Sequence, residues 1–147
     1  MKSLWQVGDR QELVERLRRV GADHPARWGK MDAPQMVAHC ADAVRMALGT
    51  LPVPSKRLPT RYPPLKQILV YLLPFPKSVP TAPELIQRRA GDWNTEVADL
   101  IRLMEELAAR RPNDLAPEHP AFGTMSHNAW GVLGYKHLDH HLRQFGK

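Results

Sequence analysis

The chain has 147 residues, 43% hydrophobic and 24% charged, a composition that indicates one globular domain able to bury a full core rather than a disordered chain. The sequence contains no apolar run of 18 residues or more, so we predict no membrane span. The N-terminus also lacks the apolar region of a signal peptide, and the single cysteine, Cys40, cannot form an internal disulfide bond. We therefore expect a cytoplasmic protein.

The formal net charge of +6 raises the question of nucleic-acid binding. The denser basic patches lie at 16–19, 56–66, 88–89 and 110–111, and no helix-turn-helix, zinc-finger or RNP-like aromatic motif accompanies them. Basic residues without a reading element give at most non-specific attraction to phosphates. We interpret these patches as a solvated basic surface and expect no nucleic-acid partner.

The first helical pattern follows Asp9, which has Glu12 three residues later in the spacing of a capping box. We therefore expect a helix that begins at Asp9 and ends at Gly21. Its apolar stripe consists of Leu13, Leu17 and Val20.

The second helical pattern begins after Asp32, a suitable N-cap residue, and the following Pro34 is tolerated in a first helical turn. Gly49 is a natural end for this helix. Its apolar stripe consists of Met36, Cys40, Ala43 and Ala47.

Residues 50–91 contain most of the 14 prolines of the chain, and prolines this frequent prevent a long regular element. A short apolar helix at 65–73 is the one exception that we predict. A connection of this length suggests a crossover along a helical bundle or a lid over a pocket.

The third and fourth long helices are predicted at about 92–110 and from a cap at Ser126 to Gly146. No segment shows convincing strand alternation. We therefore predict an all-α fold, a four-helix bundle with one long proline-rich crossover between its second and third helices, in a single domain over 1–147.

Three of the seven histidines lie near the end of the fourth predicted helix. His137 and His141 are one turn apart on the face that Trp130 also occupies, whereas His140 lies to one side and Lys136 on the opposite side. Two imidazoles at positions i and i+4 of an inward face can clamp one metal ion. The same spacing also arises by chance among hydrogen-bonded core histidines, so the helix alone leaves both interpretations open.

His39, near the apolar arc of the second predicted helix, could face the pair across a bundle. Three imidazoles would leave a fourth position open for water or substrate, as in catalytic metal sites. Cys40 points about 100° away from His39 and is interpreted as a small core residue. The motif is not that of HExxH proteases, because Leu138 stands where the glutamate base would be.

Two stretches of the sequence resemble the superfamily of DinB-like and YfiT-like metalloenzymes, and they are most similar to a branch of it whose function is uncharacterised. They are RWGKMDAPQMVAHCADAVRMALG at 27–49 and HPAFGTMSHNAWGVLGYKHLDHHLRQFG at 119–146. The resemblance implies a four-helix bundle with an up-down-down-up course. It also implies a divalent metal ion, zinc or nickel, held by His39, His137 and His141.

The resemblance further implies a metal-dependent transferase that uses a low-molecular-weight thiol, or a hydrolase, acting on a small molecule, and it suggests a homodimer. The crossover of this chain is richer in proline than is typical of the superfamily, so the resemblance does not indicate which substrate this chain would use. The residues expected around the metal or in the pocket are His140, Gln144, Trp130 and His119. For His119, which precedes a proline, the favoured alternative is that it only caps its turn.

Two other classes of function stay open at this point. The chain could be a non-catalytic module that binds a metal or a small ligand. A DNA-associated stress protein is the third alternative, and it rests only on net charge and the name of the superfamily.

Overall fold

The structure is a computed structural model that describes residues 1–77, 81–111, 114 and 118–147, and it is mostly helical. Its long helices are α1 (Val7–Arg18), α2 (Ala33–Ala47), α4 (Trp93–Ala108) and α5 (His127–Gln144). Two-residue strands, β1 (Glu118–His119) and β2 (Gly123–Thr124), pair antiparallel in the loop before α5. This small hairpin was not predicted, because two residues are too few to show an alternating pattern.

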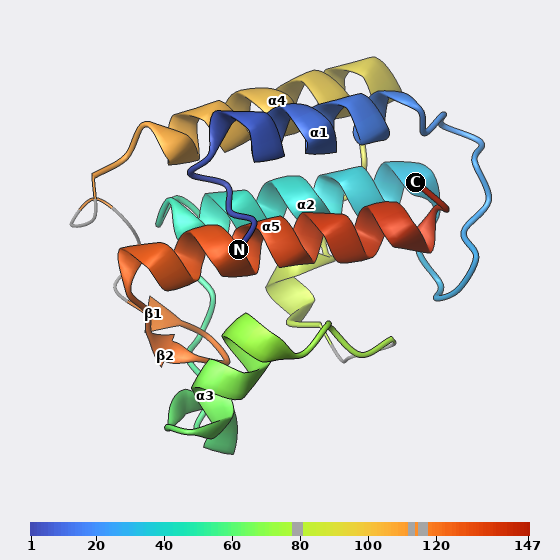
Figure 1. The fold of residues 1–147 in the computed structure, drawn as a ribbon. Coiled ribbons are helices and arrows are strands. Elements are labelled where there is room, and N and C mark those ends of the chain that lie inside the picture. Colours follow the sequence, from blue (N-terminus) through green and yellow to red (C-terminus); the bar gives the residue numbers. More distant parts are fainter. Residues whose placement is uncertain (78–80, 112–113, 115–117) are drawn as a thin grey trace.

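The four long helices lie side by side, with α1 and α4 in one layer and α2 and α5 in the other (Figure 1). Contacts join α2 to α4 and α1 to α5, and further contacts join α2 to α5 and α1 to α4. Because α2 and α5 are neighbours, side chains from segments far apart in the sequence can meet between them. No helix in the described ranges combines the length and the apolar character that crossing a bilayer would require.

The predicted start of the first helix was wrong. α1 begins at Val7, and the side chain of Asp9, inside its first turn, accepts a hydrogen bond from Ser3 N at 2.8 Å instead of capping the helix. The segment before α1 lies on α5, where Leu4 N donates to Gly131 O at 3.0 Å. This tertiary contact fixes the segment before Asp9, so the helix begins before the residue that the cap-like spacing selected.

Gly131 is required for that contact. A Cβ atom at this position would lie 2.3 Å from Trp5 Nε1, which is closer than a real Cβ contact. Trp5 Nε1 in turn donates to His127 O at 2.8 Å, so the N-terminal segment is fixed against the first two turns of α5.

α1 ends at Arg18, before the predicted Gly21, and α4 ends at Ala108, shortly before the predicted end at about 110. The predicted caps at the starts of the other long helices and the glycine after α2 are confirmed. Asp32 and Gln35 form a reciprocal capping box at the start of α2, and Gly49 has the positive φ of a C-terminal glycine. Asp92 caps α4 and Ser126 caps α5 through their side-chain oxygens.

The proline-rich crossover contains short helical turns, and the predicted helix at 65–73 is confirmed in position. It consists of α3 (Leu65–Gln67), which continues as a π-helical turn, η2 (Ile68–Leu72). Two 3₁₀ turns, η1 (Pro59–Arg61) and η3 (Pro83–Leu85), flank it. The segment from α3 to η2 lies beside α5, so the crossover covers one side of the helical layers (Figure 1).

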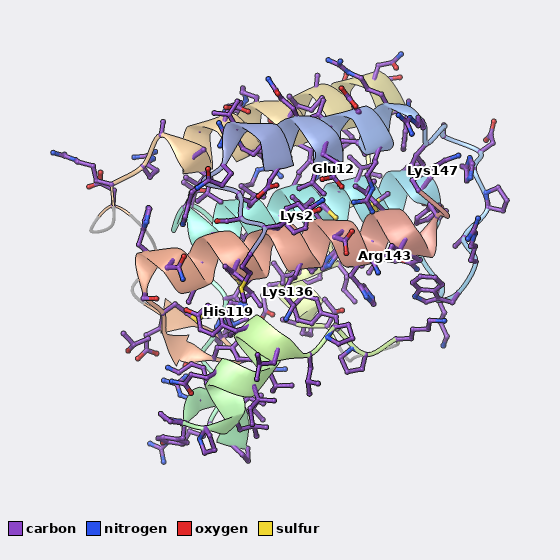
Figure 2. The ribbon with its side chains drawn as sticks, viewed as in Figure 1. Lys2, Glu12, His119, Lys136, Arg143 and Lys147 are labelled. Carbon is purple, nitrogen blue, oxygen red and sulfur yellow. The ribbon has the colours of Figure 1, made fainter. Side chains whose placement is uncertain are left out.

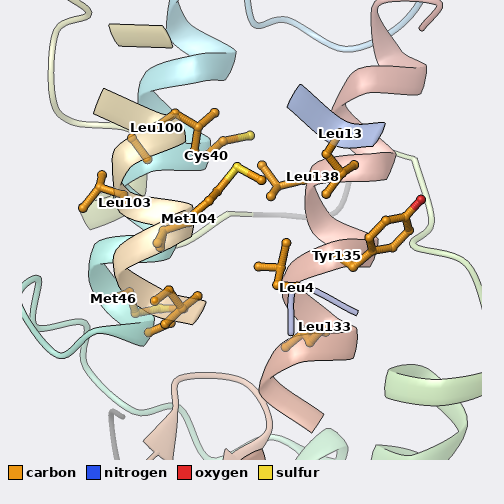
Figure 3. Close-up of a cluster of buried hydrophobic side chains, with 14 of the residues drawn as sticks. Leu4, Leu13, Cys40, Met46, Leu100, Leu103, Met104, Leu133, Tyr135 and Leu138 are labelled. Carbon is orange, nitrogen blue, oxygen red and sulfur yellow. The ribbon is translucent and has the colours of Figure 1, made fainter. Parts of the chain in front are cut away.

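The core lies between the two helical layers and includes side chains from every long helix (Figure 3). Leu13 of α1, Met104 of α4 and Leu138 of α5 are almost fully buried there. Cys40 is buried against Met36, and burial raises the pKa of its thiol well above the ordinary value. Cys40 is therefore a core residue, as its position on the helix indicated.

Candidate metal centre

Three histidines meet between α2 and α5. His39 comes from α2, and His137 and His141 come from α5. One ring nitrogen from each of the three lies within 4.8 Å of the others, and the Nε2 atoms of His39 and His137 are 3.0 Å apart. The structure thus brings together the three residues that the sequence and the resemblance selected as metal ligands.

Two of the three rings are oriented by oxygen atoms behind them. His39 Nδ1 lies 3.0 Å from the carbonyl oxygen of Leu85, and His141 Nδ1 lies 2.9 Å from Oε1 of Gln144. Because these oxygens only accept hydrogen bonds, each Nδ1 carries the proton and each Nε2 keeps a free lone pair. Hydrogen bonds of this kind hold metal-binding imidazoles in many proteins.

Gln144 is itself held in one orientation. Its Nε2 donates to the carbonyl oxygen of Trp28 at 2.8 Å, so its Oε1 is the end that faces His141. Gly29 has a φ of 82°, and a Cβ there would lie 2.5 Å from Gln144 Nε2. A glycine at this position therefore makes room for the amide that orients the histidine.

Burial keeps the three imidazoles neutral. Loss of hydration lowers the pKa of His39, lowers that of His141 to about 3, and lowers that of His137 well below its ordinary value. The charges that the other histidines would carry lower the pKa of His137 and His141 further. Neutral imidazole is the form that binds a metal ion.

The spacing of one ligand pair is close to that of a tetrahedral metal site. Zinc–nitrogen bonds of 2.0–2.1 Å place two ligand nitrogens about 3.3 Å apart, close to the 3.0 Å between His39 and His137. Within the described part of the chain, these three histidines form the one cluster of potential ligands, and no carboxylate or thiolate belongs to it. The donor set therefore leaves one position open, as catalytic sites do.

A cavity of about 700 Å³ adjoins the three histidines. Its walls come from α2, α5, the crossover and the β1–β2 loop, and they are mostly apolar. Every residue that we predicted around the metal lines it: His140, Gln144, Trp130 and His119. The expectation that the crossover covers a pocket agrees with Phe75 and Leu85, which form part of the wall.

His140 lies beside the cluster rather than in it. Its ring packs edge-on against His141, with ring centres 5.3 Å apart, and against Phe75 and Trp28 at 6.0 Å. Burial lowers its pKa, but the ring is only partly buried. The position agrees with the helical wheel, which placed His140 to one side of the shared face.

His119 caps its turn and also lines the cavity. Its Nδ1 accepts hydrogen bonds from the backbone N–H groups of Ala121 and Phe122 at 3.1 and 3.3 Å. Burial lowers the pKa of this histidine to about 4. Both of the interpretations that the sequence left open for His119 therefore describe its position.

The chain from residue 5 to residue 147, including every residue of the site, matches the model of a family described as "Protein of unknown function (DUF1569)". The chain belongs to this family. A search of curated proteins finds no match to it, and a search of solved structures finds none.

Sequence reasoning missed two supports of the site in this DUF1569 chain. The first is Lys136, whose ammonium group donates to the carbonyl oxygens of Leu69, Val70 and Leu73 at 2.7, 2.8 and 2.6 Å (Figure 2). These carbonyls end the π-helical turn η2, so Lys136 attaches the crossover to α5 one residue before His137. A helical wheel shows only that Lys136 faces away from the histidines and cannot show this attachment.

The second support is a group of ion pairs behind Leu85. Arg88 contacts the buried carboxylates of Asp42 on α2, at 3.1 Å, and Glu96 on α4, at 2.5 Å. These contacts fix the segment that carries the Leu85 carbonyl against both helices. No sequence signal could have identified the carbonyl, because a backbone oxygen is present at every residue.

Proposed function

We propose that this chain is a metal-binding DinB-like protein that uses a divalent ion to catalyse transfer to, or hydrolysis of, a small molecule. The proposal depends chiefly on one observation. Three neutral imidazoles each bring one ring nitrogen to a common point beside a cavity of about 700 Å³, with Nε2 unprotonated on His39 and His141 and no fourth ligand from the described residues.

The likeness to the DinB-like superfamily supports the proposal through the order of the helices and the positions of the histidines on them. One histidine comes from the second long helix and an HxxxH pair from the last, and a long crossover joins the second and third long helices. The four-helix bundle with an up-down-down-up course is part of the proposal. Zinc and nickel are the ions that we propose, because both bind neutral imidazole.

The chemistry of the site would come from the ion and from the residues around it. A divalent ion on three neutral ligands keeps its full charge and acidifies a water or a low-molecular-weight thiol. Leu85 and Gln144 hold the ligand rings, and the apolar walls exclude bulk water from the cavity. His140 lies at the cavity wall against His141, where it is available to take up a proton.

The first test is the metal content of the purified protein. We expect about one equivalent of a divalent ion, and its loss in His39→Ala, His137→Ala and His141→Ala. His140→Ala is the matched control, because it removes a neighbouring imidazole that lies outside the cluster, and we expect it to retain the ion. No metal in the wild-type protein, or undiminished metal in all three variants, would refute the site.

A second measurement separates catalysis from a structural or storage role. X-ray absorption spectroscopy of the metal-loaded protein should show three imidazole nitrogens and one oxygen from solvent. A fourth ligand from the protein would instead favour a non-catalytic binding module, because a closed shell leaves no position for substrate.

A further inference from the structure

The cavity has a second polar end, away from the three histidines. On α5, Trp130 precedes His137 by seven residues, which places it about 10 Å away along the helix axis. The ring of His119 packs against Trp130 with ring centres 5.4 Å apart. His119, which belongs to strand β1 of the β1–β2 hairpin, therefore lies at the end of the cavity beneath α5 (Figure 2).

The protonation of His119 is determined by its neighbours. Two backbone N–H groups point at Nδ1, so this nitrogen must carry the lone pair and Nε2 must carry the proton. No described residue accepts a hydrogen bond from Nε2. His119 thus offers the cavity a neutral N–H donor, and the low pKa of the ring, about 4, keeps it neutral.

A lysine lies at the same end. The backbone N–H of Lys56 donates to Pro120 O at 2.9 Å, which places this residue beside the turn that holds His119. Lys56 is exposed at the mouth of the cavity that it lines, and its ammonium group has no ion pair or hydrogen bond with any described residue. The nearby carboxylate of Glu118 already pairs with Arg61 at 3.0 Å.

The rest of the wall contains no negative charge. None of the described residues that line the cavity is an aspartate or a glutamate. The surface between the far end and the histidines is mostly apolar and includes Phe122, Leu133 and Trp130, whose buried Nε1–H has no partner among the described residues. An anionic group at the far end would meet two donors and no repulsion, and an apolar body would fill the space toward the histidines.

We propose that the far end of the cavity binds the carboxylate of a small, mostly apolar molecule, with His119 Nε2–H and Lys56 Nζ as the donors. Two donors suit a single carboxylate with its two oxygens. The inference deepens the proposed function by naming the substrate class for the same cavity, and it rests on that function only for the chemistry at the histidines.

The test uses metal-free protein in EDTA at pH 8, so that neither an ion nor a protonated histidine can attract the probe. The probes are 4-phenylbutanoate and its neutral isostere 4-phenylbutanamide, and binding is measured by titration calorimetry. We expect the carboxylate to bind about tenfold more tightly than the amide, because only the carboxylate makes charge-assisted hydrogen bonds.

Three variants test which side chains cause the preference for the carboxylate over the amide. His119→Asn keeps a side-chain acceptor for the two backbone N–H groups but removes the donor to the cavity, and Lys56→Met removes the ammonium group. Each should weaken carboxylate binding about threefold and amide binding less, so that the two donors together account for the tenfold preference. Arg57→Met is the matched control, because Arg57 carries the same charge and is exposed like Lys56 but does not line the cavity.

Equal binding of the two probes to the wild-type protein, or no binding of the carboxylate, would overturn the proposal. Carboxylate binding that is unchanged in Lys56→Met would also overturn it, and this variant tests it even if His119→Asn does not fold. His39→Ala should bind the carboxylate as the wild-type protein does. A chain that binds the carboxylate but no metal would thus refute the proposed function while leaving this inference intact.

Discussion

Replacing Gln144 by leucine should weaken metal binding without unfolding the protein. Gln144 is buried, accepts from His141 Nδ1 at 2.9 Å and donates to Trp28 O at 2.8 Å. Leucine has a similar volume and neither polar group, so the Nδ1–H of His141 becomes a buried donor without an acceptor. Such a loss costs about 1–3 kcal/mol of unfolding free energy.

Gln144→Leu should lower the affinity for the metal ion more than the same substitution at an exposed position. Without Gln144, the His141 ring can rotate or place its proton on Nε2, and either change removes a ligand lone pair. Residues that orient metal-binding histidines typically contribute about 10- to 100-fold to affinity, which is about 1.4–2.7 kcal/mol. We expect a decrease in this range for Gln144→Leu.

The assay is a competition titration of metal-free protein with zinc and a chromophoric chelator at pH 7.5, together with urea unfolding. The control is Gln11→Leu, the same substitution at an exposed position of α1. A Gln144→Leu protein that is folded and binds zinc within twofold of the wild-type affinity would refute the assigned tautomer of His141.

Two further predictions concern the supports of the site. Arg88→Met should lower the unfolding free energy by about 2 kcal/mol, less than for a fully buried pair because the Arg88 side chain is 35% exposed. Hydrogen bonding from Arg88 lowers the pKa of Glu96 below its ordinary 4.5, so this part of the unfolding free energy is lost as the pH falls from 4.5 through the folded pKa. Urea unfolding at pH 5 and pH 3 should therefore show a smaller loss of unfolding free energy in Arg88→Met than in the wild-type protein. Lys136→Met should increase amide hydrogen exchange at residues 68–73 relative to the wild-type protein, since three carbonyls lose their donor. Unchanged exchange there would mean that Lys136 does not hold the crossover.

The sequence was sufficient for most helix limits because the signals are local. Asp32, Asp92 and Ser126 each cap the helix that follows, and Gly49 ends α2. The start of α1 could not be predicted, because it depends on the contact of the N-terminal segment with α5 rather than on the cap-like spacing that begins at Asp9.

The sequence by itself determined that His137 and His141 share one face of a helix, since helical periodicity follows from the order of residues. Only the tertiary structure placed His39, 98 residues before His137, with its Nε2 atom 3.0 Å from that ring. Only the tertiary structure could also decide which nitrogen is free in the rings of His39 and His141, because their partners are the Leu85 carbonyl and an amide held by Trp28 O. The identities of possible ligands are written in the sequence, but their protonation and direction depend on groups that packing brings to them.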